Sequence, residues 1–171
     1  HSAKAEDYEA VATLWEKIRS HIAKFDNSEY ISALANGDIC VAIGYSGDIF
    51  QAADRASEAG NGVEIAYSIP KEGAVIWFDL MAIPKDAPHP EAAHAFLDYI
   101  LRPEVIGPIT NYVYYANGNA EAAPYTDSEI LEDEAVYPTD EVMAKLFPEM
   151  YPDPSIERMR TRIWNRVKTG R

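Results

Sequence analysis

Hydrophobic residues follow two patterns along the chain, a helical spacing in some segments and short continuous or alternating runs in others. Residues 6–24 place apolar side chains at steps of three and four, which predicts an amphipathic helix. Residues 39–44 form a short apolar run and residues 63–69 alternate, so both predict strands. Further helices are predicted at residues 29–35, 49–59, 91–101, 103–112, 127–131, 140–146 and 155–168. Helices and strands that alternate along a chain are typical of an α/β fold.

A third predicted strand, residues 73–84, is apolar on both faces and ends in a proline. Asp79 lies within it, and an ionised carboxylate among apolar neighbours is costly unless a cation meets it. Because strand side chains alternate, Trp77 and Asp79 are expected to point to the same face. An indole beside a carboxylate forms half of a cage for an alkylammonium ion. In the structural alternative, Asp79 lies at a strand end, where it caps a helix or pairs with an arginine.

A second candidate position follows the strand at residues 39–44, where the chain turns through Tyr45 and Asp48 into a helix. A strand, a glycine turn and a helix start form a place where α/β proteins bind ligands. Tyr45 and Asp48 are therefore candidate ligand contacts. In the structural alternative, Ser46 or Asp48 caps the helix and Tyr45 packs on a neighbour.

The composition is that of a packed globular protein, with 47% hydrophobic and 11% aromatic residues in a chain of 171. The net charge of −13 disfavours nucleic acid as a partner and suits a small cationic ligand. With Cys40 alone no internal disulfide is possible, and its apolar surroundings predict a buried side chain. No segment approaches the length of a membrane span, and the first residues lack the pattern of a signal peptide. The helix at residues 91–101 is expected to bury Ala92, Ala95, Phe96 and Tyr99.

Known catalytic and metal-binding signatures are missing from the sequence. It has no glycine-rich phosphate loop, no Gly-x-Ser-x-Gly elbow and no His-Glu-x-x-His motif. His89 and His94 are five residues apart, a poor spacing for sharing a metal, so we expect no metal and no cofactor. We therefore expect a binding protein and not an enzyme. The candidate ligand contacts are aromatic and acidic residues that together suit a diamine, namely Tyr45, Asp48, Trp77, Asp79 and Tyr115.

Six motifs follow one another over nearly the whole chain. The longest is Ala-Asn-Gly-Asp-Ile-Cys-Val-Ala-Ile-Gly-Tyr-Ser-Gly-Asp at residues 35–48. In this order the motifs resemble those of the periplasmic polyamine-binding proteins of bacterial ABC transporters, and the putrescine-preferring branch is the most similar. The other five motifs lie at residues 68–74, 77–79 (Trp-Phe-Asp), 101–105, 115–117 (Tyr-Ala-Asn) and 161–164 (Thr-Arg-Ile-Trp).

The resemblance implies an α/β fold of the two-lobed periplasmic-binding-protein type (type II), which closes on a polyamine between its lobes. Carried over by motif position, the ligand contacts would be the same five residues that their chemistry favours. Tyr45 stands where that branch commonly has a Trp, and Trp77 stands where it commonly has a Phe, so the preferred polyamine stays open. Asn27 is a weaker candidate, at a position where the family can place a Ser that faces the ligand.

Family members are longer, and the chain resembles only their C-terminal half. By this analogy residues 1–54 belong to the second lobe, residues 55–112 complete the first lobe, and residues 113–171 return to the second lobe with a C-terminal helix. The implied partners are a small-molecule polyamine, a membrane permease of an ABC transporter, and either the missing N-terminal half or a swapped copy of the chain. The implied location is the periplasm.

Two other functions stay open from the sequence. The first is a polyamine sensor that presents its loaded form to a receptor protein. The second, more remote, is a hydrolase that uses Asp48 and Asp79 as an acid and base pair.

Overall fold

The computed structural model describes residues 2, 4–149 and 152–170 of the chain, which divides into two compact units. Unit 1 combines residues 1–27 with residues 147–171, and unit 2 contains residues 28–146. Unit 1 thus joins the two ends of the chain, while unit 2 is continuous in sequence and holds all five candidate ligand contacts. No helix among the described residues is both long enough and apolar enough to cross a membrane.

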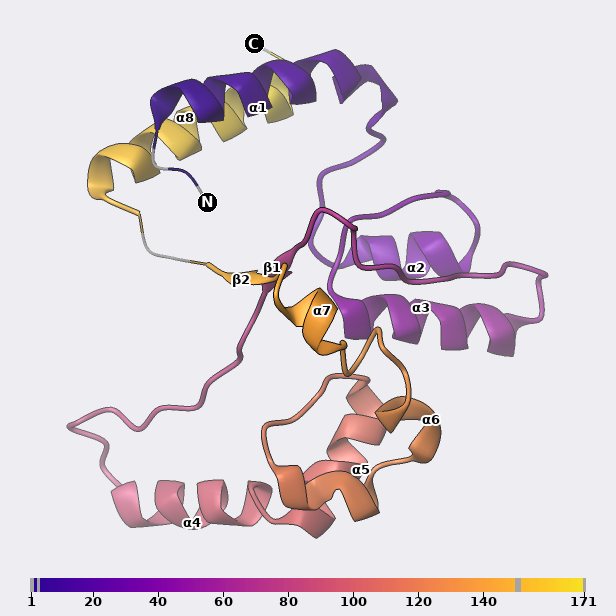
Figure 1. Cartoon of the computed structure of the whole chain (residues 1–171), viewed down its shortest axis with the longest axis vertical. Coiled ribbons are helices and arrows are strands. Elements are labelled where there is room, and N and C mark those ends of the chain that lie inside the picture. Colours follow the sequence, from indigo (N-terminus) through magenta and orange to yellow (C-terminus); the bar gives the residue numbers. More distant parts are fainter. Residues whose placement is uncertain (1, 3, 150–151, 171) are drawn as a thin grey trace. The chain divides into compact units, whose positions relative to one another are not determined.

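Two helices that lie side by side form most of unit 1 (Figure 1). Helix α1 spans Ala5–Ile18, the 3-10 helix η1 follows at Arg19–His21, and α8 spans Pro154–Thr169 after the short strand β2 at Phe147–Pro148. At the start of α8 the Asp153 side chain accepts a hydrogen bond of 2.8 Å from the Ser155 backbone N–H. This N–H lies in the first turn, where backbone N–H groups have no acceptor within the helix.

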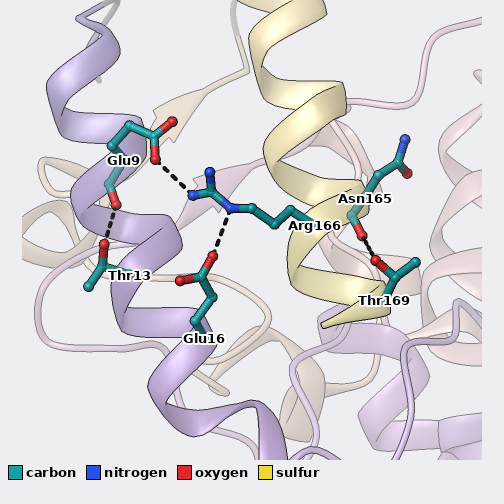
Figure 2. A network of polar contacts seen from close by, with 6 residues as sticks. All are labelled: Glu9, Thr13, Glu16, Asn165, Arg166 and Thr169. Atoms are coloured by element: carbon teal, nitrogen blue, oxygen red, sulfur yellow. Dashed lines mark hydrogen bonds and ion pairs between the residues drawn. The ribbon is translucent and has the colours of Figure 1, made fainter. Parts of the chain in front are cut away.

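Aromatic packing and ion pairs hold α1 and α8 together. The rings of Trp15, Phe25 and Trp164 pack edge-on or tilted, with centroids 5.0 to 6.2 Å apart. The guanidinium of Arg166 lies 2.7 Å from a carboxylate oxygen of Glu9 and 2.7 Å from one of Glu16, as Figure 2 shows. These side chains are partly exposed, so apolar packing contributes more to the pair of helices than its salt bridges do.

Unit 2 is built mainly of helices. They are α2 (Glu29–Ala35), α3 (Ser46–Ala59), α4 (Pro90–Ile100), α5 (Pro103–Val113), η2 (Ala120–Tyr125), α6 (Ser128–Leu131) and α7 (Asp140–Met143), with the short strand β1 at Val75–Ile76. Helices α2 and α3 pack against each other, and α5 packs against η2. Buried side chains between α2 and α3 form the core that lies under the candidate site, namely Tyr30, Leu34, Ile49 and Ala52.

The predicted helices are observed, but two of them are shorter than expected. The helix predicted at residues 6–24 ends at Ile18 and continues only as η1 to His21, and the helix predicted at residues 140–146 ends at Met143. Most of the predicted strands are not paired. Among the described residues, only β1 and β2 are assigned as strands, two residues each. Residues 63–69 still alternate, with their odd-numbered positions half-buried and their even-numbered positions exposed. In residues 39–44, Ile39 packs on the α2–α3 core, but Val41 and Ile43 are 84% and 87% exposed. A strand needs a neighbouring backbone, and the described residues supply none beside these segments.

Two expected burials are wrong for the same reason. Cys40 is exposed in the extended segment before α3. On α4, Phe96 and Tyr99 are 56% and 51% exposed, and Ala92 and Ala95 are exposed as well. The pattern marks apolar side chains, but no described element covers them.

Candidate functional site

Asp48 lies in the first turn of α3, where two tyrosine hydroxyls meet its carboxylate. The Tyr30 hydroxyl donates a hydrogen bond of 2.5 Å to Oδ2, and the Tyr115 hydroxyl donates one of 3.2 Å to Oδ1. Tyr45 occupies the N-cap position of α3, and no side-chain hydrogen bond caps this helix. Asp48 is therefore held by phenols and does not act as a helix cap. The start of a helix also favours negative charge, because the backbone N–H groups point toward it.

Two glycines make room for the tyrosines around Asp48. A Cβ at Gly44 would lie 2.5 Å from Cε2 of Tyr30, and a Cβ at Gly47 would overlap the Tyr115 ring and the carbonyl oxygen of Val113. Real Cβ atoms do not approach other atoms this closely. The glycines of the turn at residues 44–47 thus let both phenols reach the same carboxylate.

Both phenols stay protonated, and hence remain donors, well above neutral pH. Burial raises the pKa of Tyr30 to about 12, and the hydrogen bond to Asp48 adds to the effect. The pKa of Tyr115 is also raised, first by burial and then by the charge of Asp48. The arrangement is a carboxylate framed by aromatic rings that carry no charge of their own, which suits an organic cation.

Trp77 and Asp79 form a second pair, after β1. The indole Nε1–H of Trp77 donates a hydrogen bond of 3.1 Å to Oδ1 of Asp79, which confirms that the two side chains share a face. The indole of Trp77 is 54% exposed and Asp79 is exposed. A carboxylate that accepts one indole hydrogen bond keeps further lone pairs for a cation.

The predicted residues thus fall into two sets. In the first set, the Tyr115 hydroxyl donates to the Asp48 carboxylate. Tyr45 is linked to this set through its backbone N–H, which donates a hydrogen bond of 3.3 Å to the Tyr30 hydroxyl. The second set is the indole and carboxylate pair after β1. No hydrogen bond or ion pair between residues that the structure describes links one set to the other. Asn27 is exposed.

Tyr30 is the site residue that the sequence does not predict. It lies in the helix expected at residues 29–35, whose apolar spacing gives it a core role, and its partner Asp48 is 18 residues away. The sequence signal is indirect: Gly44 and Gly47 lie in the turn, and the lack of a Cβ at each lets the rings of Tyr30 and Tyr115 approach the backbone. The described residues contain no group of three or more side chains that could hold a metal ion.

Two hollows in the described surface lie away from these residues. One, of about 670 Å³, is lined by residues from Pro152 to Arg162 in unit 1. The other, of about 470 Å³, lies in unit 2 between the second half of α3 and residues 62–65. Neither is lined by any of the five predicted contacts.

Comparison with known proteins agrees with the resemblance carried by the motifs. The family model for "Bacterial extracellular solute-binding protein" matches residues 2–139. The chain is 50% identical to the putrescine-binding periplasmic protein PotF of Escherichia coli over 172 residues, which cover 100% of this chain and 46% of that protein. It is 46% identical to a putrescine/agmatine-binding protein of Pseudomonas aeruginosa, over 99% of this chain and 46% of that protein.

A solved structure gives the same result for the fold. The chain superposes with a TM-score of 0.77 on the spermidine/putrescine ABC transporter substrate-binding protein PotD of Streptococcus pneumoniae, at 27% identity, covering 98% of this chain and 50% of that one. The chain therefore spans about half the length of the relatives it matches. It belongs to the family of bacterial extracellular solute-binding proteins, and it corresponds to roughly the C-terminal half of their two-lobed α/β fold.

Proposed function

We propose that the chain forms the C-terminal half of a periplasmic protein that binds a polyamine, most favourably a diamine such as putrescine, and delivers it to the permease of an ABC transporter. The observation that carries this proposal is the pair of acidic positions with aromatic partners, Asp48 with Tyr115 and Asp79 with Trp77. Support also comes from the high identity to proteins named for putrescine binding.

The chemistry of a diamine matches these two positions. A diamine has an ammonium group at each end and apolar methylenes between them. Asp48 and Asp79 supply one counter-charge each, and the rings of Tyr45, Trp77 and Tyr115 supply faces that attract cations and cover methylenes. Partial exposure of these rings in the described structure leaves them accessible to a ligand.

A second half of the fold is part of the proposal. Residues 1–54 and 113–171 would belong to one lobe and residues 55–112 to the other, with the ligand enclosed when the lobes close. The outer apolar side chains of the extended segments, Val41, Ile43 and Leu80, are 84% to 88% exposed. We propose that they are covered by strands of the remaining half, or by the same segments of a swapped copy.

Calorimetry with a diamine and a matched monoamine tests the proposed function. The full-length product of the gene that carries this sequence is titrated with putrescine and with n-butylamine, which has the same chain length but one ammonium group. We expect micromolar or tighter binding of putrescine, and binding of butylamine weaker by about 10- to 100-fold, because one charge-assisted contact is lost. Equal affinity for the two amines would exclude recognition by two carboxylates, and no binding of either would overturn the proposal.

A further inference from the structure

Tyr30 is far more buried than Tyr115 and Tyr45, the two predicted tyrosines of the site. It is 8% exposed, whereas Tyr115 is 37% exposed and Tyr45 is 52% exposed. Its ring belongs to the core formed by α2 and α3. A ring packed in this way keeps its hydroxyl in one place, while the more exposed rings are free to adjust to a ligand.

The Tyr30 hydroxyl connects the backbone at the start of α3 to the carboxylate of Asp48. It accepts a hydrogen bond of 3.3 Å from the Tyr45 N–H and donates one of 2.5 Å to Oδ2 of Asp48. A hydroxyl has a single proton, so a phenol that accepts from the backbone directs that proton to the carboxylate. The lack of a Cβ at Gly44 lets the ring approach this closely.

We infer that Tyr30 is the positioning residue of the ligand site, which fixes the direction of the Asp48 carboxylate before a ligand arrives. This inference rests on the proposed function, because the direction matters only when Asp48 meets an ammonium group. Oδ2 is held toward the core, which leaves the side of Oδ1, next to the more exposed Tyr115, as the side that meets the ligand. A carboxylate has about four acceptor positions, so one phenol on each oxygen leaves capacity for an ammonium group.

Positioning of this kind raises affinity without a contact between Tyr30 and the ligand. A free carboxylate loses rotational freedom when it pairs with a cation, and a carboxylate that is already held does not. Removal of the Tyr30 hydroxyl should therefore weaken ligand binding only when the Asp48 carboxylate is present. A purely structural role would weaken binding whether or not Asp48 is present.

A double-mutant cycle separates the two roles. Putrescine is titrated calorimetrically into the full-length gene product and its variants Tyr30→Phe, Asp48→Asn and the double variant. Tyr67→Phe is the matched control. Tyr67 is partly buried against the same core and its ring packs near that of Phe50. Among the described residues, no carboxylate is a partner of its hydroxyl. We expect Tyr30→Phe to weaken binding about tenfold and Tyr67→Phe to change it less than about twofold. In the Asp48→Asn background, Tyr30→Phe should change the affinity less than about twofold.

A second variant keeps the inference testable if Tyr30→Phe does not fold. Asp48→Glu keeps the charge and the Tyr30 ring but moves the carboxylate by one methylene, so we expect a loss of at least about tenfold. The inference is overturned if Tyr30→Phe or Asp48→Glu binds like the original protein, or if the loss from Tyr30→Phe persists beside Asp48→Asn. If the original protein binds no putrescine, the proposed function itself fails, and this result is distinct because it needs no variant.

Discussion

At the scale of single residues, Asp79 gives the sharpest test of the ligand site. Asp79→Asn keeps the shape of the side chain and its acceptor for the Trp77 indole, but removes the counter-charge for an ammonium group. We expect putrescine affinity to fall by about 10- to 100-fold, while the affinity for butylamine changes much less if Asp48 holds its single ammonium group. Asp98→Asn, an exposed carboxylate on α4, serves as the control. Calorimetry that gives the same loss for both variants would remove Asp79 from the site.

The raised pKa of the Tyr30 phenol predicts how the free energy of unfolding changes at high pH. Its pKa is raised to about 12 in the folded chain, above the ordinary value near 10. The stability from the neutral phenol is therefore fully present below about pH 10 and is lost as the pH rises through about 12. Urea unfolding between pH 8 and 11.5 should show the original protein losing more stability than Tyr30→Phe, which has no phenol at this position. Parallel losses in the two proteins would contradict the assignment.

At the scale of elements, the turn into α3 depends on close approach of Tyr115 to the backbone. Gly47→Ala would place a Cβ against the Tyr115 ring and the Val113 carbonyl, so the ring must move away from Asp48. We expect a loss of about 1–3 kcal/mol in the free energy of unfolding, measured by urea denaturation, together with weaker putrescine binding. Gly118→Ala is the control, because open space surrounds that position. A Gly47→Ala variant as stable as Gly118→Ala would show that the turn tolerates a side chain.

Elements set by residues close together in the sequence could be predicted, and contacts between residues far apart in the sequence could not. The helix predicted at residues 29–35 is observed with the same bounds, because its spacing and its end signals lie within the ten residues 28–37. The contact between Trp77 and Asp79 is predicted from their two-residue spacing in an extended segment, although the observed strand β1 ends at Ile76. Residues 39–44 can pair as a strand only beside another backbone segment, and the contact between Tyr30 and Asp48 joins two helices. Neither result can be predicted from the residue pattern of a single segment.

At the scale of the whole molecule, the extended segments of unit 2 have backbone groups without partners. Among the residues described by the structure, the amides of residues 40–44 and 64–69 have no hydrogen-bond acceptor. An unpaired edge with apolar side chains favours association with further strands. The proposed second half of the fold would supply those partners, since the relatives that match this chain are about twice its length.

Hydrogen exchange can therefore detect the second half directly. In the full-length gene product, we expect the amides of residues 40–43 and 64–69 to exchange more slowly by a factor on the order of a thousand or more, because central strands open only with global unfolding at a cost of about 5 kcal/mol. In the chain of 171 residues alone, the same amides should exchange at nearly unprotected rates, while those within α3 stay protected. Native mass spectrometry of each sample identifies whether a longer polypeptide, a second peptide or a second copy is present. Fast exchange of residues 40–43 in the full-length product would show that these segments are not strands of a sheet, and it would remove the basis for a second half that pairs with them.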